Sequence, residues 1–358
     1  MVPIRKLLSV AAAVLCATLL VAAPAHAARN LDKVFWGPAE QSGVSQFPIY
    51  RDLGVTVFGD TLSWSDVAKT RPADPTNPAD PAYSWPDLDA KMADAQANGI
   101  SYLFQVLLTP GWANGGQSPA WAPDDPQDYA NFLIAASKRY PSVKRWMVWG
   151  EPCNMLNWQP LTYQKYGRRL TSSQKATVRR YALLLDDAYG ALKSVSPDNV
   201  VIGGNTWSVC DIRPLDWIQN MRLPNGKPPR MDLYGHNPVG FVDRKTPLPP
   251  KDHIAELRQT PLLQQYVDRY LGRPNGARID VWLSEFFLPT VGNPNTSFVV
   301  TPAQQPKFIK EALRLARHYP RVRAFGYIHL YDSADNGNAG LLTADGTKKS
   351  AYYAFKRG

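Results

Sequence analysis

The chain is organised around the stretch Val143-Lys144-Arg145-Trp146-Met147-Val148-Trp149-Gly150-Glu151-Pro152-Cys153-Asn154. Its first half is rich in aromatic and β-branched residues and is bounded by Pro141 and Pro152, which predicts a short buried strand. We expect the strand to end at Glu151, because proline cannot donate a hydrogen bond to a sheet. A carboxylate at the tip of a buried strand is costly unless it has a partner or a chemical role.

A second segment repeats this design far downstream, in Ile279-Asp280-Val281-Trp282-Leu283-Ser284-Glu285-Phe286-Phe287. Here too an apolar strand ends in a glutamate. The chain has only five glutamates, so two of them at strand ends are a specific signal. Of the other three, we expect Glu256 and Glu311 to lie in helices and Glu40 in a loop after the first strand.

Strand and helix patterns alternate along the chain without a break in composition. The expected strands are 34–38, 55–58, 100–107, 143–149, 200–205, 231–237, 279–287 and 323–332. The clearest expected helices are 46–52, 88–99, 128–140, 173–195 and 302–319. This alternation predicts an α/β fold of parallel β/α units in one domain. Eight strands favour a closed barrel over an open sheet, and no glycine-rich phosphate loop follows any of them.

These residues carry a family resemblance. Trp149-Gly150-Glu151-Pro152-Cys153-Asn154 resembles the Asn-Glu-Pro signature that ends strand four in clan A glycoside hydrolases. Trp282-Leu283-Ser284-Glu285 resembles the strand-seven nucleophile of that clan, and Tyr83-Ser84-Trp85-Pro86-Asp87-Leu88-Asp89 resembles the start of its second helix. The cellulase-like families and family 39 are the most similar. The resemblance covers nearly the whole chain after residue 27 and implies a single (β/α)8 TIM barrel.

The resemblance also implies a retaining glycosidase. Retention needs two carboxyl groups about 5–5.5 Å apart, one attacking the sugar and one protonating the leaving oxygen. In a β/α barrel both must project from C-terminal strand ends, where the active site forms. Glu151 is then the general acid/base, with a pKa raised by burial and a neighbouring anion, and Glu285 the ionised nucleophile. The alternative is that each glutamate simply pairs with an arginine.

Two departures from the clan pattern bear on the substrate. The clan usually has an asparagine before the acid/base that touches the sugar 2-hydroxyl, and Gly150 stands there instead. We expect that contact to be lost unless Asn154 or Asn205 replaces it. The arginine common on strand two is also missing, with Gly59-Asp60 near its place. These departures keep open a second hypothesis, a non-catalytic carbohydrate-binding barrel. A more remote one is an inverting enzyme that uses Asp60 or Asp332.

Further substrate-binding candidates lie near expected strand ends. His236 ends strand six, where such enzymes often place a histidine near the nucleophile, although a structural histidine is an equal alternative. Trp36 and Trp112 lie where aromatic rings could stack on sugars, and Tyr327 lies on strand eight. Each of these aromatic residues is as readily explained by core packing.

The cysteines and histidines indicate a disulfide and no metal. Beyond residue 27 only Cys153 and Cys210 remain, and a lone pair in an exported protein usually forms one disulfide. Both follow neighbouring strands, so their loops could meet at one rim. The histidines show no metal-ligand spacing, and we expect no metal and no cofactor.

The first 27 residues have the features of a leader. Arg5 and Lys6 precede an apolar run, and Ala25-His26-Ala27 forms a small-x-small cleavage site. We therefore expect 1–27 to be a signal peptide, 28–358 to be the barrel domain, and the protein to be secreted. A retained anchor is the alternative. No second apolar run is long enough to span a membrane.

The chain is basic, with a net charge of +10. The basic residues are scattered, with short clusters at Arg168-Arg169 and Arg179-Arg180. This pattern favours a solvated basic surface over a patch for acidic glycans. We expect a carbohydrate substrate, no nucleic-acid partner and a monomer.

Overall fold

The computed structural model describes residues 31–165, 167–238, 255–272, 276–292 and 298–358. The predicted signal peptide, 1–27, lies outside the described residues, as do the first three residues of the predicted domain.

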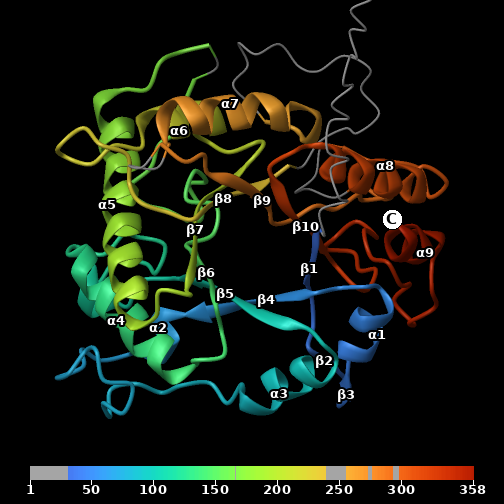
Figure 1. The fold of residues 1–358 in the computed structure, drawn as a ribbon, viewed down its shortest axis with the longest axis horizontal. Coiled ribbons are helices and arrows are strands. Elements are labelled where there is room, and N and C mark those ends of the chain that lie inside the picture. Colours follow the sequence, from blue (N-terminus) through green and yellow to red (C-terminus); the bar gives the residue numbers. More distant parts are fainter. Residues whose placement is uncertain (1–30, 166, 239–254, 273–275, 293–297) are drawn as a thin grey trace, which may run out of the picture.

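Eight parallel strands close into a barrel in the described part of the chain. They are β1 (Asp32–Trp36), β4 (Val57–Ser63), β5 (Ser101–Leu107), β6 (Arg145–Val148), β7 (Val200–Trp207), β8 (Leu233–Asn237), β9 (Asp280–Leu283) and β10 (Val322–Ile328). Each strand pairs with the next, and β1 pairs with β10 to close the ring, so the first and last strands lie side by side (Figure 1). The predicted single (β/α)8 barrel is confirmed.

Helices surround the strands and connect them. They are α1 (Phe47–Asp52), α2 (Trp64–Val67), α3 (Asp89–Ala97), α4 (Pro126–Arg139), α5 (Ser172–Val195), α6 (Pro214–Asn220), α7 (Thr260–Tyr270), α8 (Gln305–His318) and α9 (Ser350–Arg357). Figure 1 shows them on the outside of the strands, with α5 opposite α8 and α9. The longest, α5, begins with a capping box between Thr171 and Gln174. This outer position leaves the barrel ends to the loops.

Two hydrophobic cores follow from the alternation of side chains along the strands. The inner core fills the barrel with buried residues from seven strands: Val34, Val57, Leu103, Met147, Ile202, Trp282 and Ala324. The outer core lies between strands and helices. On α5, Tyr181, Leu184, Leu185 and Ala188 are all buried there, as their spacing predicts. The barrel is therefore a packed layer, not a pore.

Small differences from the predicted elements concern segment ends and two glutamates. The second strand continues to Ser63 instead of ending at residue 58. Glu40 lies in a two-residue strand, β2 (Glu40–Gln41), paired with β3 (Val44–Ser45), rather than in a loop. Glu256 caps the 3-10 helix η3 (Leu257–Gln259) instead of lying inside a helix, because its side chain accepts a backbone hydrogen bond there. Glu311 lies in α8 as predicted.

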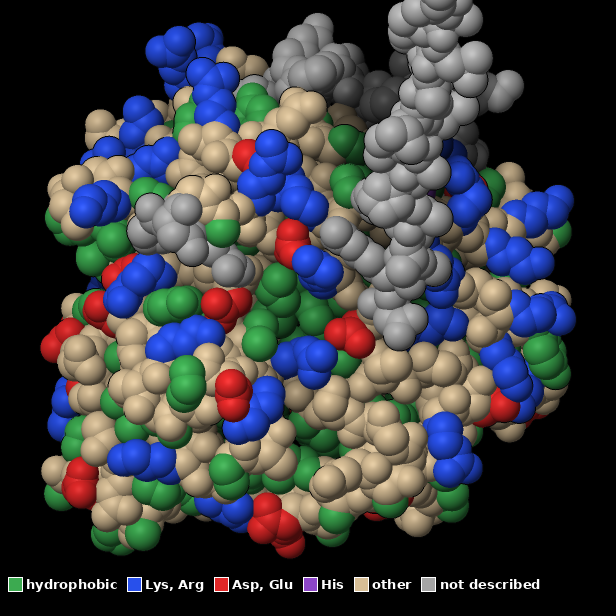
Figure 2. Space-filling model, viewed as in Figure 1, with side chains coloured by type: hydrophobic (Ala, Val, Ile, Leu, Met, Phe, Trp, Pro, Cys, Tyr) green, Lys and Arg blue, Asp and Glu red, His purple; other side chains and the backbone are tan. Residues whose placement is uncertain are grey.

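Helix hydropathy and the distribution of charge describe the outside of the barrel. In the described ranges no helix is long and apolar enough to cross a membrane. On the face drawn in Figure 2, Lys and Arg side chains are spread among acidic and uncharged ones. This distribution agrees with a solvated basic surface.

Candidate active site

The backbone around Glu151 is held in an unusual conformation. Trp149 has a φ of 67° and Glu151 a φ of 44°, both in the left-handed region that L-residues rarely adopt. The indole Nε1 of Trp149, the residue after β6, donates to the carbonyl of Asn157 at 2.7 Å. This bond closes the loop that carries Glu151. Non-glycine residues with positive φ gather at functional sites, where the surrounding structure holds them in place.

Glu285 follows β9 on the same edge of the barrel, because all eight strands are parallel. The residue before it is fixed from two sides. Ser284 donates its backbone N–H to the carbonyl of His236 at 2.9 Å, and its own carbonyl accepts a hydrogen bond from Trp36 Nε1 at 3.0 Å. Phe286, which comes next, is buried in the outer core. Glu285 is thus presented by a rigid backbone.

Asn237, the last residue of β8, links the two carboxyl groups. Its Nδ2 donates to Glu151 Oε1 at 2.8 Å. The same amide also lowers the pKa of Glu285 by hydrogen bonding, so it faces both carboxyl groups. The two glutamates are 134 positions apart in the sequence, and both carboxyl groups contact the side chain of Asn237.

Burial raises the pKa of both carboxyl groups. For Glu285 burial acts first and the charge of Glu151 second, and together they raise the pKa to about 8. For Glu151 burial raises the pKa, while hydrogen bonds from Asn237 and Asn154 lower it. Two such carboxyl groups cannot both ionise easily, because the charge of one raises the pKa of the other. No cation of the described residues is among the causes that shift either pKa.

His236 lies next to Asn237 but faces away from the carboxyl groups. Its Nδ1 contacts Thr206 Oγ1 at 2.9 Å and its Nε2 the carbonyl of Ala255 at 2.6 Å. It is fully buried, and burial lowers its pKa to about 4, so the ring is neutral. Both nitrogens are occupied, which matches the structural alternative. Sequence reasoning selected His236 and missed Asn237, although side-chain alternation along the strand was the available signal.

Asn205 lies at the end of β7, fully buried and with a φ of 40°. Neither its Oδ1 nor its Nδ2 has a hydrogen-bond partner, and the same holds for Asn237 Oδ1. Buried amides are normally satisfied, so unpartnered polar atoms in this layer suit a ligand or water. Asn154, the other amide considered, hydrogen bonds to Glu151.

Trp36 occupies the space where the second-strand arginine is missing. A Cβ atom at Gly59 would lie 2.5 Å from the Trp36 ring, so the indole packs directly on the glycine. The same ring is anchored by its Nε1, which donates to the carbonyl of Ser284. Trp36 therefore spans from β4 to the backbone beside Glu285.

The other two aromatic candidates are held by contacts within the protein. Trp112 donates from Nε1 to the carbonyl of Ala68 at 2.7 Å, and the guanidinium of Arg71 lies 4.4 Å from its ring centre. Tyr327 is fully buried in the outer core, where its hydroxyl donates to the carbonyl of Ala339 at 2.8 Å. Both hydrogen-bonding groups are therefore used within the protein.

The predicted disulfide is present. Cys153 and Cys210 are joined, with Cα atoms 5.4 Å apart and a sequence separation of 57. Nearby, the backbone N–H of Ile212 donates to the carbonyl of Cys153, and Met155 N–H donates to Asp211 Oδ2 at 2.7 Å. The bridge and these bonds fix the loop that carries Glu151 to the loop after β7.

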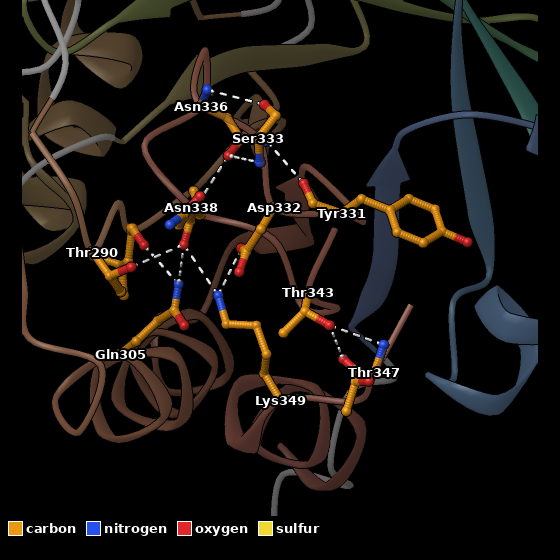
Figure 3. A network of polar contacts seen from close by, with 12 residues as sticks. Thr290, Gln305, Tyr331, Asp332, Ser333, Asn336, Asn338, Thr343, Thr347 and Lys349 are labelled. Atoms are coloured by element: carbon orange, nitrogen blue, oxygen red, sulfur yellow. Dashed lines mark hydrogen bonds and ion pairs between the residues drawn. The ribbon is translucent and has the colours of Figure 1, made fainter. Parts of the chain in front are cut away.

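Neither aspartate considered for an inverting mechanism is free. Asp332, in the loop after β10, is paired with Lys349 at 2.7 Å, and both side chains are largely buried. Figure 3 shows Asp332 and the carbonyl of Asn338 converging on the Lys349 ammonium. Asp60 accepts the backbone N–H of Thr61 at 2.8 Å, and burial raises its pKa. Among the described residues, no cluster of His, Cys, Asp and Glu is suited to a metal ion.

The sequence matches no protein-family model and no curated protein significantly. The fold, in contrast, is similar to solved structures. One is a family 39 glycoside hydrolase from the gut symbiont Bacteroides cellulosilyticus WH2, with 20% identity and a TM-score of 0.66 over 92% of this chain and 63% of that chain.

Two further structures show the same fold at greater distance. A monomeric β-xylosidase from Caulobacter crescentus CB15 has 17% identity and a TM-score of 0.60, over 92% of this chain and 67% of that one. A Bacteroides uniformis β-glucuronidase 2 has 12% identity and a TM-score of 0.56, over 92% of this chain and 34% of that one. The chain thus spans less than two thirds of the family 39 structure with the highest of these scores. Together with the closed barrel, these likenesses show a (β/α)8 barrel fold similar to that of family 39 glycoside hydrolases.

Proposed function

We propose that this protein is a retaining glycoside hydrolase that cleaves O-glycosidic bonds in an oligo- or polysaccharide. The observation that carries the proposal is the pair Glu151 and Glu285, at the C-terminal ends of β6 and β9, facing one amide of Asn237. Active sites of β/α barrels form at this face. The names of the structural neighbours, a β-xylosidase and a glucosidase among them, support the same reaction class.

The proposed mechanism is a double displacement. Glu285 attacks the anomeric carbon while Glu151 donates its proton to the leaving oxygen, and water assisted by Glu151 then hydrolyses the glycosyl-enzyme. The raised pKa of Glu151 suits a general acid. The free protein favours the opposite charge state from the one we expected, because Asn237 donates to Glu151 and the pKa of Glu285 is raised to about 8. The double displacement therefore needs a redistribution that puts the proton on Glu151 and the charge on Glu285. The coupling of the two carboxyl groups makes this redistribution accessible.

A panel of 4-nitrophenyl α- and β-glycosides, followed by plant and microbial polysaccharides, tests the proposal. We expect hydrolysis of at least one member by the wild type and none by the Glu285→Gln variant. The matched control is Glu311→Gln, which replaces a half-buried, ion-paired glutamate on α8 and should retain activity. Retention is checked by following the anomer released first by NMR.

A non-catalytic carbohydrate-binding barrel is the second candidate. It is favoured by one observation, that no cation of the described residues acts on either carboxyl group. Binding on a glycan array without hydrolysis of any panel member would establish it over the enzyme.

We also propose that the protein is exported after removal of residues 1–27. The basic start, apolar run and Ala25-His26-Ala27 support this. Intact-mass measurement of the protein from a culture supernatant should give a chain that begins at Ala28. Recovery of the full-length chain in the membrane fraction would favour a retained anchor.

A further inference from the structure

The absence of a side chain at position 150 is explained by a neighbour. A Cβ atom there would lie 2.8 Å from Oε1, 2.9 Å from Cδ and 3.0 Å from Nε2 of Gln105. Gly150 does not have a positive φ, so its backbone does not require glycine. The amide of Gln105 therefore occupies the space in which a side chain at position 150, next to Glu151, would begin.

Gln105 reaches this place from the neighbouring strand. It lies on β5 and is paired in register with Met147 on β6. Leu103, two residues earlier, belongs to the inner core, so Gln105 also faces the barrel interior, one layer closer to the C-terminal face. Its side chain is only 8% exposed.

The amide of Gln105 is poorly satisfied. Its Nε2 donates only to the thioether of Met147, at 3.4 Å, and a thioether is a weak acceptor. Among the residues that the structure describes, none donates a hydrogen bond to its Oε1. A nearly buried amide in this state is available for hydrogen bonds from a ligand or from water.

We propose that Gln105 is a specificity-determining residue that binds the hydroxyl on C2 of the sugar whose glycosidic bond is cleaved. The inference rests on the proposed function. Glu151 must lie at the oxygen attached to the anomeric carbon, so a group in the space beside it meets the substituents of the neighbouring atoms. In an aldose the hydroxyl adjacent to the anomeric carbon is on C2. An amide offers one donor and one acceptor to it, which matches a hydroxyl.

The test compares the most rapidly hydrolysed 4-nitrophenyl glycoside of the panel with its 2-deoxy analogue. The Gln105→Met variant keeps the length and volume of the side chain but removes the amide. We expect it to lower kcat/KM about tenfold on the 2-hydroxy substrate, the size of one net hydrogen bond, and to leave the 2-deoxy substrate unchanged. An equal loss on both substrates, or none on either, overturns the inference.

A second pair of variants tests the shared space. Gly150→Asn alone should lower both thermal stability and kcat/KM, because the new side chain overlaps the Gln105 amide. Adding Gln105→Ala should recover both, together with discrimination against the 2-deoxy substrate. If the double variant is no better than Gly150→Asn, the two positions do not share the space and the inference fails.

These outcomes separate the inference from the function on which it rests. Activity that Glu285→Gln abolishes but Gln105→Met leaves unchanged overturns the role of Gln105 alone. A wild type that hydrolyses no glycoside of the panel and no polysaccharide overturns both.

Discussion

Asn237 Nδ2 donates a hydrogen bond to Glu151 Oε1 at 2.8 Å, and the same amide lowers the pKa of Glu285. One neutral side chain thus sets the balance of charge between two buried carboxyl groups. Since no arginine of the described residues is among the groups that shift either pKa, the amide is the main group that favours ionisation of the pair. Its removal should therefore affect how activity depends on pH.

The first prediction concerns Asn237→Leu, which keeps the approximate size of the side chain and removes the donor. Because the amide lowers both carboxyl pKa values, its loss should raise the pKa at which the pair first ionises. We expect the acidic limb of the kcat/KM profile to move to higher pH and kcat to fall about tenfold or more. The measurement is a pH–rate profile on an aryl glycoside.

His236→Gln is the control for that experiment. The ring contacts Thr206 and Ala255 rather than the carboxyl groups, so the variant should lose stability without a shift of the profile. If the pH profile of kcat/KM shifts in His236→Gln but not in Asn237→Leu, then His236 and not Asn237 acts on the carboxyl groups.

The second prediction concerns stability and Glu285. Its folded-state pKa is raised to about 8, whereas an unperturbed glutamate in the unfolded chain has a pKa of about 4.3. Between these two pH values the folded protein binds a proton that the unfolded chain releases. The stability contributed by this proton binding is therefore complete below about pH 4.3 and is lost as the pH rises towards 8. Glu285→Gln removes this dependence. The gain in Tm over the wild type should therefore grow from pH 5 to pH 8.

Glu311→Gln should behave in the opposite way. Hydrogen bonds and charge from Arg314 and Arg258 lower the pKa of Glu311, so its contribution to stability is present at neutral pH and lost in acid. This variant should therefore be less stable than the wild type at pH 7, with the difference shrinking as pH falls. A Tm difference for Glu285→Gln that does not change with pH would contradict the raised pKa.

The sequence was sufficient for the barrel and for the placement of both glutamates. Strands that are buried on both faces appear in the sequence as short apolar runs. Two of these runs stop at a charged residue, Glu151, which is followed by a proline, and Glu285. Segment ends were less well predicted. The second strand continues through Asp60 and Thr61, because its pairing with β5 runs on to Ser63 despite the polar residues.

The side chains around the glutamates were harder to predict, because a shift by one residue changes the face of a strand. His236 and Asn237 are adjacent, and histidine drew the assignment by residue type, although Asn237 faces the carboxyl groups. The packing of Gln105 against Gly150, and of Trp36 against Gly59, depends on contacts between neighbouring strands. The sequence showed that side chains were missing at Gly59 and Gly150, but only the packing shows what occupies their space.

The third prediction concerns the disulfide between Cys153 and Cys210. The bridge closes a loop with a sequence separation of 57, for which the chain-entropy estimate is about 4 kcal/mol of stability. We expect the double variant Cys153→Ala/Cys210→Ala to lose stability of that order in urea unfolding. Its kcat at a temperature where it is folded should stay close to that of the wild type, because backbone hydrogen bonds from Met155 and Ile212 still hold the two loops together.

Alkylation of the wild type supplies the matching chemical check. Without reductant neither thiol should be labelled, and after reduction and unfolding both should be. Labelling of Cys153 and Cys210 in the untreated, unreduced protein would show that the bridge is absent there.

The last prediction separates the roles of the two glutamates. Glu285→Ala should abolish turnover of every glycoside, because no covalent intermediate can form. The effect of Glu151→Ala should depend on the leaving group. An aryl glycoside with a good leaving group needs little protonation, so its first step should survive while that of an alkyl glycoside collapses.

Azide then distinguishes the two variants by the product. With Glu151→Ala the glycosyl-enzyme forms but lacks a base to activate water, and azide, which needs none, should restore turnover and give a glycosyl azide of retained configuration. With Glu285→Ala, azide should attack the sugar directly and give the inverted product. The configuration of each azide is measured by NMR coupling at the anomeric proton. An inverted azide from the Glu151 variant would mean that the acid/base and nucleophile roles are exchanged.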